Sequence, residues 1–252
     1  MYQTIKNPNI DYGAVHMDTD HVLCKTIVPP LDVITTGSLI LIAGASGSGK
    51  TSLLVNLISK TGTKNGFKQS FRKCFHKIIV CSPSTATLKK DVFKGIPDDQ
   101  KYDDFHECMT DIDDHLSASK LQGEVDEEKK FNLLILDDVA AALRQSRQNE
   151  IYLTQLLQNR RHKNLTTVII SQKFTFFPTG IRSNANVIFL FQPKTMQEQK
   201  AITDEILPMH SKETLDLMNF VFDGRYNHLM IDMTLKRSSR FRFFKNFEEI
   251  IL

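Results

Sequence analysis

Residues Ser38–Thr51 read SLILIAGASGSGKT, an apolar run followed by a glycine-rich loop. The loop fits the pattern G-x-x-x-x-G-K-[ST], in which glycines let successive backbone N–H groups point at phosphate oxygens. The helical pattern Thr51–Lys60 then adds the positive end of its dipole. We therefore expect a nucleoside triphosphate here, with Lys50 bridging its β- and γ-phosphates and Thr51 as a ligand of Mg²⁺. The residues expected to contact ATP are Gly44, Ala45, Ser46, Gly47, Ser48, Gly49, Lys50, Thr51 and Ser52.

A second motif follows 86 residues later, where the apolar run Leu133–Leu136 leads directly into Asp137 and Asp138. A carboxylate at the end of a strand beside a phosphate loop holds Mg²⁺, directly or through water, and we assign that role to Asp137. Asp138 stands where many P-loop ATPases carry a glutamate that polarises the attacking water. Because aspartate is one methylene shorter, the water must lie closer to it or the contact must be relayed.

Six short, β-branched segments predict buried strands, and their near-continuous apolar character suits parallel strands covered on both faces. Helical patterns separate several of them; in Arg147–His162 the predicted apolar side is Ile151, Leu153, Leu156 and Leu157. This alternation predicts an α/β fold: a P-loop NTPase with a mostly parallel, RecA-like sheet flanked by helices and extra strands at its C-terminal edge. The predicted strands are Ser38–Gly44, Lys77–Pro83, Asn132–Asp138, Thr166–Gln172, Asn186–Gln192 and His228–Thr234.

The chain has 252 residues, 41% of them hydrophobic and 24% charged, which excludes wholesale disorder and coiled-coil architectures. No apolar run approaches the ~18 residues of a membrane helix. The N-terminus lacks the basic and apolar regions of a signal peptide, so we expect an intracellular protein with no membrane partner. Four cysteines without a C-x-x-C pair make a disulfide framework or a thiolate metal site unexpected. We predict one domain over residues 36–252, an N-terminal extension over 1–35, and a polar, partly helical insertion at about 96–130.

Charge is distributed unevenly along the chain. Residues 97–128 contain twelve Asp or Glu and two Lys, so the rest of the chain carries 17 acids against 30 Lys or Arg, a formal charge of +13. So large a positive charge outside residues 97–128 favours a polyanionic partner, with the acidic stretch held away from that partner. A solvated acidic loop on an ordinary surface is the alternative interpretation.

Two further features bear on the class of ATPase. The strand predicted at Lys77–Pro83 lies between the two motifs, where nucleotide-driven mechanical ATPases insert a strand and simple nucleotide kinases do not. The fourth predicted strand ends in Gln172, whose tip is expected beside the metal carboxylate, so that Gln172 could touch the γ-phosphate or the attacking water. An ordinary amide at a strand end is the alternative for Gln172.

Taken in order, GASGSGKTS, IIVCSP, LLILDDV, RRHKNLTTVIISQ and FPTGIRSNANVIFLF resemble the viral DNA-packaging ATPases of the FtsK–HerA superfamily. These occur in poxviruses, other large nucleocytoplasmic DNA viruses and virophages. The double aspartate is typical of that branch, as are Arg161-His162 and an arginine shortly after Phe177-Pro178. The resemblance covers about Leu39 to Gln192.

The resemblance implies an ATP-driven motor that threads double-stranded DNA into a preformed capsid, in contact with capsid vertex proteins. It implies a homo-oligomeric ring in the host cytoplasm or viral factory, with association with the virion as a further option. It also implies an arginine supplied in trans to the γ-phosphate. Arg182 is the leading candidate and Arg161 the second, each with an ordinary surface cation as the alternative.

DNA contacts have several candidates. Lys236–Lys245 (KRSSRFRFFK) carries five positive charges and three phenylalanines, so Lys236, Arg237, Arg240 and Arg242 could neutralise backbone phosphates. The favoured interpretation is an edge strand in which Phe241 and Phe243 form one buried face. Lys163 and Lys173 are weaker candidates. Two other functions stay open: a P-loop kinase of a nucleotide or small molecule, and a non-hydrolysing assembly scaffold.

Overall fold

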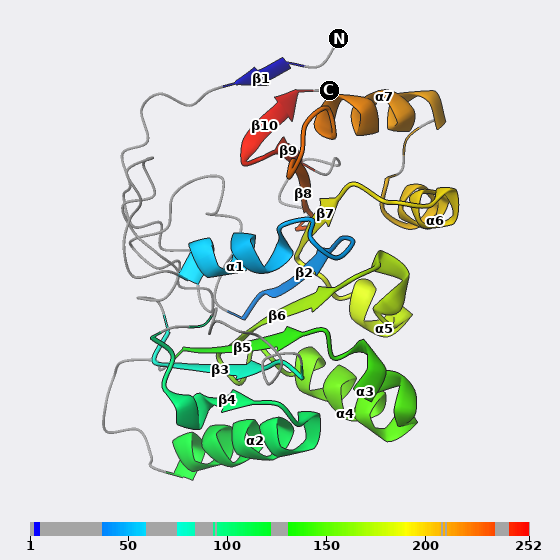
Figure 1. Cartoon of the computed structure of the whole chain (residues 1–252). Coiled ribbons are helices and arrows are strands. Elements are labelled where there is room, and N and C mark those ends of the chain that lie inside the picture. Colours follow the sequence, from blue (N-terminus) through cyan, green and yellow to red (C-terminus); the bar gives the residue numbers. More distant parts are fainter. Residues whose placement is uncertain are drawn as a thin grey trace.

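The computed structural model describes residues 3–5, 37–58, 75–83, 93, 95–121, 131–207, 209, 211–234 and 242–251. They form a ten-stranded sheet of order β1-β10-β9-β8-β7-β2-β6-β5-β3-β4, which runs the length of the molecule (Figure 1). The strands are β1 (Gln3–Ile5), β2 (Leu39–Ala43), β3 (Lys77–Cys81), β4 (Lys101–Tyr102), β5 (Asn132–Asp137), β6 (Leu165–Ser171), β7 (Val187–Phe191), β8 (His228–Asp232), β9 (Arg242–Lys245) and β10 (Glu248–Ile251). The helices are α1 (Lys50–Ile58), α2 (Phe105–Leu121), α3 (Ala140–Gln145), α4 (Arg147–Gln158), α5 (Thr179–Arg182), α6 (Met196–Ile206) and α7 (Ser211–Val221), with 3₁₀ turns η4 (Asp98–Gln100) and η5 (Phe174–Phe176).

The predicted fold class is confirmed. All six predicted strands are present, as β2, β3, β5, β6, β7 and β8, and the strands from β4 across to β7 in the sheet pair in parallel. Beyond β7 the pairing turns antiparallel through β8, β9, β10 and β1, which supplies the extra strands predicted at the C-terminal edge.

The order of the strands in the sheet differs from their order along the chain. The segment Lys77–Pro83 lies between the two motifs in sequence, as predicted, and forms β3 on the far side of β5, while β6 is the strand that separates β2 from β5. Ile170 of β6 pairs with Ile42 on one side and with Asp137 on the other. Crossover connections reorder parallel strands in the sheet, so order along the chain does not give order in space. The end of β6 therefore lies between the glycine-rich loop and the acidic strand end.

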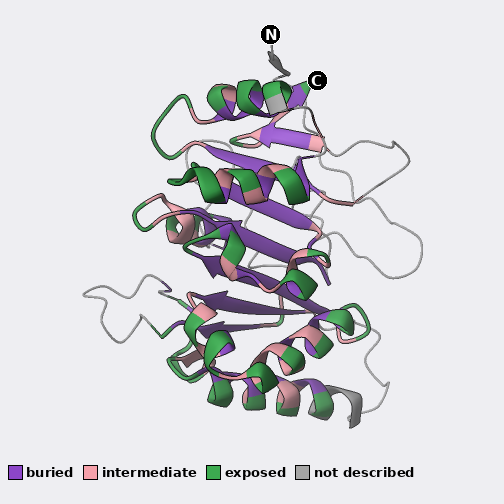
Figure 2. Ribbon diagram, turned by 90° about the vertical axis from the view of Figure 1, so that its right-hand side faces the viewer, coloured by how far each residue is buried: buried purple, intermediate pink, exposed green. Residues whose placement is uncertain are grey.

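Helices cover both faces of the sheet. Leu39 and Leu41 of β2 pack into a core with α2 through α7, whereas Ile40 and Ile42 pack against α1 on the opposite face. Figure 1 shows α1 on one side of the sheet and α5, α6 and α7 on the other, and Figure 2 shows the buried strands behind helices whose outer faces are exposed. This double cover explains why β2 is apolar at every position.

The polar stretch around residues 96–130 contributes to the sheet and the core. Its strand β4 extends the sheet beside β3, and α2 buries Cys108, Ile112 and Leu116 in the same core as α4. Two of its acids are paired within the domain, with Asp111 at 3.0 Å from Lys77 and Asp113 at 3.3 Å from Lys163.

Two predicted apolar faces need correction. In α4, Leu153, Leu156 and Leu157 are buried as predicted, but Ile151 is 40% exposed because it lies on the solvent side of the helix. β9 is an internal strand between β8 and β10, not an edge strand, and it buries Phe243 in one core and Phe244 in the other. The predicted one-sided alternation is therefore wrong for β9, and Phe241 lies outside the described residues.

Candidate active site

The glycine-rich loop joins β2 to α1 in a conformation that two of its glycines permit. Gly47 (φ +76°) and Gly49 (φ +105°) adopt backbone angles that side chains disfavour. Lys50, the first residue of α1, reaches back so that its Nζ donates a hydrogen bond to the carbonyl of Ala45 at 3.0 Å. The Ser48 hydroxyl is buried with no hydrogen-bond partner among the described residues. The loop thus places an ammonium group and a free hydroxyl where the motif predicts phosphates.

The acidic strand end lies beside this loop. Asp137 is 8% exposed, and the Ser82 hydroxyl donates to its Oδ2 at 3.5 Å. Burial, followed by the negative charge of Asp138, raises the pKa of Asp137 to about 6. The same two carboxylates favour the charged form of Lys50, but burial outweighs them and lowers the pKa of Lys50. One ammonium group and two carboxylates therefore share a partly desolvated space.

The tip of β6 ties the two motifs together. The amide of Gly44 donates to Ser171 O at 3.2 Å, and the amide of Asp138 donates to Ile170 O at 3.1 Å. Asp138 has a left-handed backbone (φ +57°), which is uncommon outside glycine and turns its side chain at the strand end. Gln172 Nε2 then donates to Asp138 Oδ2 at 2.8 Å. The structure thus brings the predicted pair Asp138 and Gln172 into direct contact.

The donor set fits Mg²⁺. Mg²⁺ is held in such sites by one or two carboxylates together with substrate phosphates. Asp137 offers a carboxylate whose pKa is raised first by burial and then by the negative charge of Asp138, and a bound cation would favour its charged form. The Thr51 hydroxyl stands in the first turn of α1, next to Lys50. These two residues would hold the ion.

The two candidate arginines have different surroundings. Arg182 is engaged within its own chain: its Nη1 donates to Phe177 O at 2.7 Å, and its Nη2 donates to Glu205 Oε1 at 2.9 Å. Arg161 is exposed and lies against Gly37 at the amino end of β2. That end is the opposite edge of the sheet from the glycine-rich loop, roughly 20 Å away for a strand of this length. Arg161 could therefore serve only the site of another subunit.

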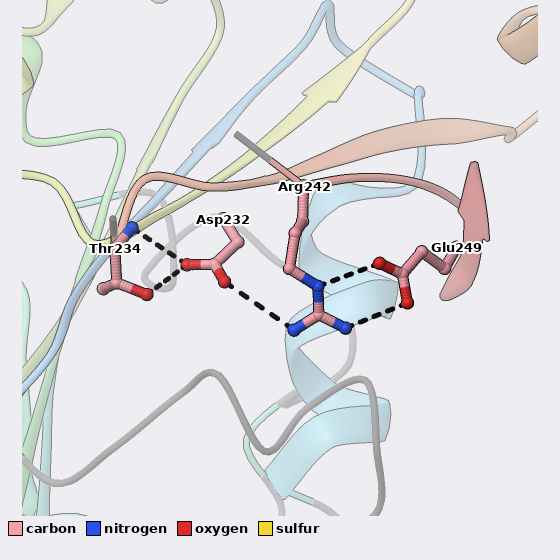
Figure 3. Close-up of polar contacts among 4 residues, drawn as sticks. All are labelled: Asp232, Thr234, Arg242 and Glu249. Atoms are coloured by element: carbon pink, nitrogen blue, oxygen red, sulfur yellow. Dashed lines mark hydrogen bonds and ion pairs between the residues drawn. The ribbon is translucent and has the colours of Figure 1, made fainter. Parts of the chain in front are cut away.

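Most described candidates for DNA contact are also engaged. Figure 3 shows Arg242 between Glu249, which accepts from its Nε at 2.9 Å and its Nη2 at 3.0 Å, and Asp232 at 3.9 Å. Lys163 is paired with Asp113 as noted above. Lys173 is exposed, with its Nζ 5.3 Å from the centre of the Phe176 ring. Lys236, Arg237 and Arg240 lie outside the described residues.

Several residues near the loop were missed from the sequence. A cavity of about 580 Å³ extends from Gly47 and Lys50 to Tyr226, His228 and Phe247. Lys194, after β7, lies close enough to Lys50 for its charge to lower the pKa of Lys50. These residues belong to no sequence motif. They are distant from the loop along the chain and come close to it only in the folded sheet, so no local signal could have identified them.

Comparisons with known proteins agree with this geometry. Residues 34–175 match the model of the AAA domain. The chain belongs to the AAA domain family. No curated protein matches it. None of the helices within the described ranges is both long and apolar enough to cross a membrane.

Solved structures share the fold of this AAA domain. The DNA-packaging ATPase B204 from Sulfolobus Turreted Icosahedral Virus is 13% identical with a TM-score of 0.56, over 82% of this chain and 96% of that one. The genome packaging NTPase B204 from Sulfolobus turreted icosahedral virus 2, in complex with ATP-gammaS, is 16% identical with a TM-score of 0.52, over 82% and 95%. The pCW3 conjugation coupling protein TcpA is 14% identical with a TM-score of 0.55, over 80% and 59%. Family and fold together support ATPase activity.

Proposed function

We propose that this AAA domain is a Mg²⁺-dependent ATPase motor that moves double-stranded DNA into a preformed viral capsid and works as a homo-oligomeric ring. One observation carries the ATPase part: the 2.8 Å hydrogen bond from Gln172 to Asp138, at the tip of the strand between the phosphate loop and Asp137. A fold shared with a protein described as a DNA-packaging ATPase supports the packaging part.

The residues divide the work of hydrolysis. Loop N–H groups and Lys50 hold the β- and γ-phosphates and offset the charge that develops on them. Mg²⁺, when bound by Thr51 and Asp137, would neutralise phosphate charge. Asp138 accepts a proton from the attacking water, and Gln172 holds the Asp138 carboxylate while its own amide oxygen orients that water. The products are ADP, phosphate and the released proton.

A ring would complete the site with a neighbour's arginine. Arg161 suits this role because it is exposed at the sheet edge far from its own loop. Arg182 can reach a neighbour only by leaving Glu205, with which it also makes a 2.7 Å contact through Nε. Both remain candidates, and their substitution separates them.

Mixing inactive variants tests the trans arginine. Arg161→Ala and Arg182→Ala subunits are each combined with Lys50→Ala subunits, and turnover is measured per active interface. We expect the Arg161→Ala mixture to regain turnover, because a mixed ring holds some interfaces with both Lys50 and Arg161. Arg182→Ala is expected to lower stability, since it removes the contacts to Phe177 and Glu205. If turnover is regained only in the mixture of Arg182→Ala with Lys50→Ala subunits, the role belongs to Arg182 instead.

The proposed track is the DNA backbone, which a motor must hold regardless of sequence. The excess of +13 outside residues 97–128 supports a polyanionic partner. The test is ATP turnover with and without double-stranded DNA, measured alongside the mass of the particle. Turnover stimulated by DNA of any sequence, in an oligomer, is the expected result; a monomer that phosphorylates a small acceptor, or that binds ATP without hydrolysis, contradicts the proposal.

A further inference from the structure

The cavity beside the phosphate loop is larger than phosphates require. Its volume of about 580 Å³ falls in the range of pockets that hold whole small ligands. Its lining includes Gly47, Lys50 and Thr51, together with aromatic rings from the end of β7 and from the turns before β8 and after β9. A nucleotide with its phosphates on the loop would extend its base toward those rings.

The aromatic wall directly adjoins the loop. A Cβ atom at Gly49 would lie 3.5 Å from Tyr226 Cδ1 and 3.5 Å from Phe191 Cε1. A Cβ atom at Gly44 would lie 2.6 Å from Phe191 Cβ, so only glycine fits there. Tyr226 is 54% exposed, an unusual state for an aromatic ring that lines a cavity. The guanidinium of Arg225 lies over the Tyr226 ring, with its Cζ 4.8 Å from the ring centre, and we assign the other face of the ring to stacking against a flat ligand.

Backbone strain is concentrated at this wall. Tyr226 (φ +69°) and Phe247 (φ +75°) are bulky residues in the left-handed region, where such residues are rare. Asn246, which precedes Phe247, is bonded to the two residues that follow Tyr226: its Oδ1 accepts from the amide of His228 at 2.9 Å, and its Nδ2 donates to Asn227 Oδ1 at 2.7 Å. Strain of this kind costs about 1–3 kcal/mol per residue and clusters at ligand sites. Here two strained residues line one cavity.

His228 is the polar group of the wall. It is 6% exposed and packed among Phe189, Phe191 and Phe247, with ring centres 5.7, 5.5 and 5.0 Å away. Its ring bonds to the backbone of Tyr226, yet its Nε2 is buried with no partner among the described residues. Nδ1 is therefore the nitrogen that donates to Tyr226. Burial lowers the pKa of His228 to about 4, so near neutral pH Nε2 carries a lone pair and can only accept.

We propose that this cavity holds the base of the bound nucleotide and that His228 Nε2 selects a 6-aminopurine over a 6-oxopurine. The inference rests on the proposed nucleotide site and adds where the base lies and which side chain selects it. An adenine amino group can donate to Nε2, whereas the guanine O6 would set a second acceptor against it. Nε2 is buried in this structure, so the proposal requires a surrounding ring to move when the base enters the cavity. Phe191, Tyr226, His228 and Phe247 all lie outside the family match at residues 34–175.

The selectivity is tested with His228→Phe, which keeps an aromatic ring and removes the lone pair. Dissociation constants are measured for ATP, GTP and inorganic tripolyphosphate on the full chain. We expect the wild type to prefer ATP over GTP and the variant to lose about three- to tenfold of that preference, the worth of one neutral hydrogen bond. The melting temperature should hold or rise, because an unpaired buried nitrogen is removed. An unchanged ATP-to-GTP ratio overturns the role of His228.

The stacking wall is tested with Tyr226→Ala, with Leu215→Ala on α7 as a control that is similarly exposed at 49%. Loss of a base stack should weaken ATP binding about 5- to 100-fold and leave tripolyphosphate binding unchanged. If ATP binding by Tyr226→Ala matches the control, the base lies elsewhere and the inference fails while the phosphate site stands. If the wild type binds neither ATP nor tripolyphosphate, the proposed function itself fails.

Discussion

The parallel strands from β4 to β7 and the antiparallel strands from β8 to β10 meet at the β7–β8 pair, and the cavity lies across that junction. On the parallel side, the polar groups follow strand ends: Lys50 after β2, Asp138 after β5 and Gln172 after β6. On the antiparallel side, the cavity is lined from a turn and a strand by Tyr226 and His228.

The difference lies in what positions each group. Parallel strands deliver their carboxyl ends to one edge, so residues that follow different strands converge without special backbone angles at most positions. The antiparallel side relies on strained residues and on side-chain hydrogen bonds such as Asn246 to His228. We infer that residues after the parallel strands carry out hydrolysis, whereas residues of the antiparallel region recognise the base of the nucleotide and shape the cavity around it.

Lys50→Ala should have the greatest consequence. Loss of an ammonium group that offsets charge on the transferred phosphate should lower turnover at least about 10²–10³-fold. The measurement is phosphate release at saturating ATP, with Lys200→Ala on the exposed surface of α6 as the matched control. Turnover equal to that of the control would remove the parallel side from the chemistry.

Asp138→Asn should reduce turnover while leaving ATP bound. A positioned proton acceptor contributes about 10²–10⁴-fold, and asparagine keeps the size of the side chain and the contact with Gln172. ATP affinity and single-turnover hydrolysis are measured on the same preparation. Equal turnover in wild type and variant would mean that another group accepts the proton, and weaker ATP binding would place Asp138 among the binding residues.

Much of the parallel side could be predicted because its signals are local. The loop motif, Asp137 and the strand end at Gln172 each lie within a few residues of an apolar run, and parallel pairing then brings them together. The position of β3 on the far side of β5 could not be predicted, since crossover connections leave the order of parallel strands open. The surroundings of Arg182 depend on Glu205, which reaches it only after folding.

Most features of the antiparallel side could not be predicted from the sequence, because they depend on contacts that form only in the folded protein. Tyr226 and Phe247 adopt backbone angles against their residue type, so propensity argues against the structure they form. Phe243 and Phe244 are neighbours buried on opposite faces, and this needs two covered faces that a single segment does not reveal. His228 was predicted only as a strand residue.

The stability of the antiparallel side should depend on pH through His228. Burial holds its pKa at about 4, below the ordinary 6.5, so the unfolded chain takes up a proton that the folded chain refuses. The contribution is complete above pH 6.5 and is lost as the pH falls toward 4. Between pH 7 and pH 5 it should lower the free energy of unfolding by about 2 kcal/mol.

Urea titrations at both pH values measure this loss. His228→Phe should remove about 2 kcal/mol from the difference between pH 7 and pH 5, whereas substitution of the exposed His106 should leave it as in the wild type. An identical pH dependence in wild type and His228→Phe would show that His228 is not held neutral, and with it the separation between the two sides would weaken.

Arg242 and Lys173 give the test with the smallest expected effect. Arg242 belongs to the antiparallel strands and Lys173 follows a parallel strand, so the two substitutions compare DNA contact in the two regions. Arg242 is 40% exposed in its side chain and paired with Glu249, so Arg242→Ala should lower the free energy of unfolding by only about 0.2–1 kcal/mol. Its positive charge is already matched, and the salt dependence of DNA binding should stay unchanged.

Lys173 follows Gln172 at the edge that carries the chemistry, and its side chain is exposed. If it neutralises a phosphate, Lys173→Ala should reduce the slope of log affinity against log salt by about one and leave stability unaltered. Fluorescence anisotropy of labelled duplex DNA at several salt concentrations measures both slopes. A reduced slope for Arg242→Ala with an unchanged slope for Lys173→Ala would reverse the assignment and place the DNA on the antiparallel side.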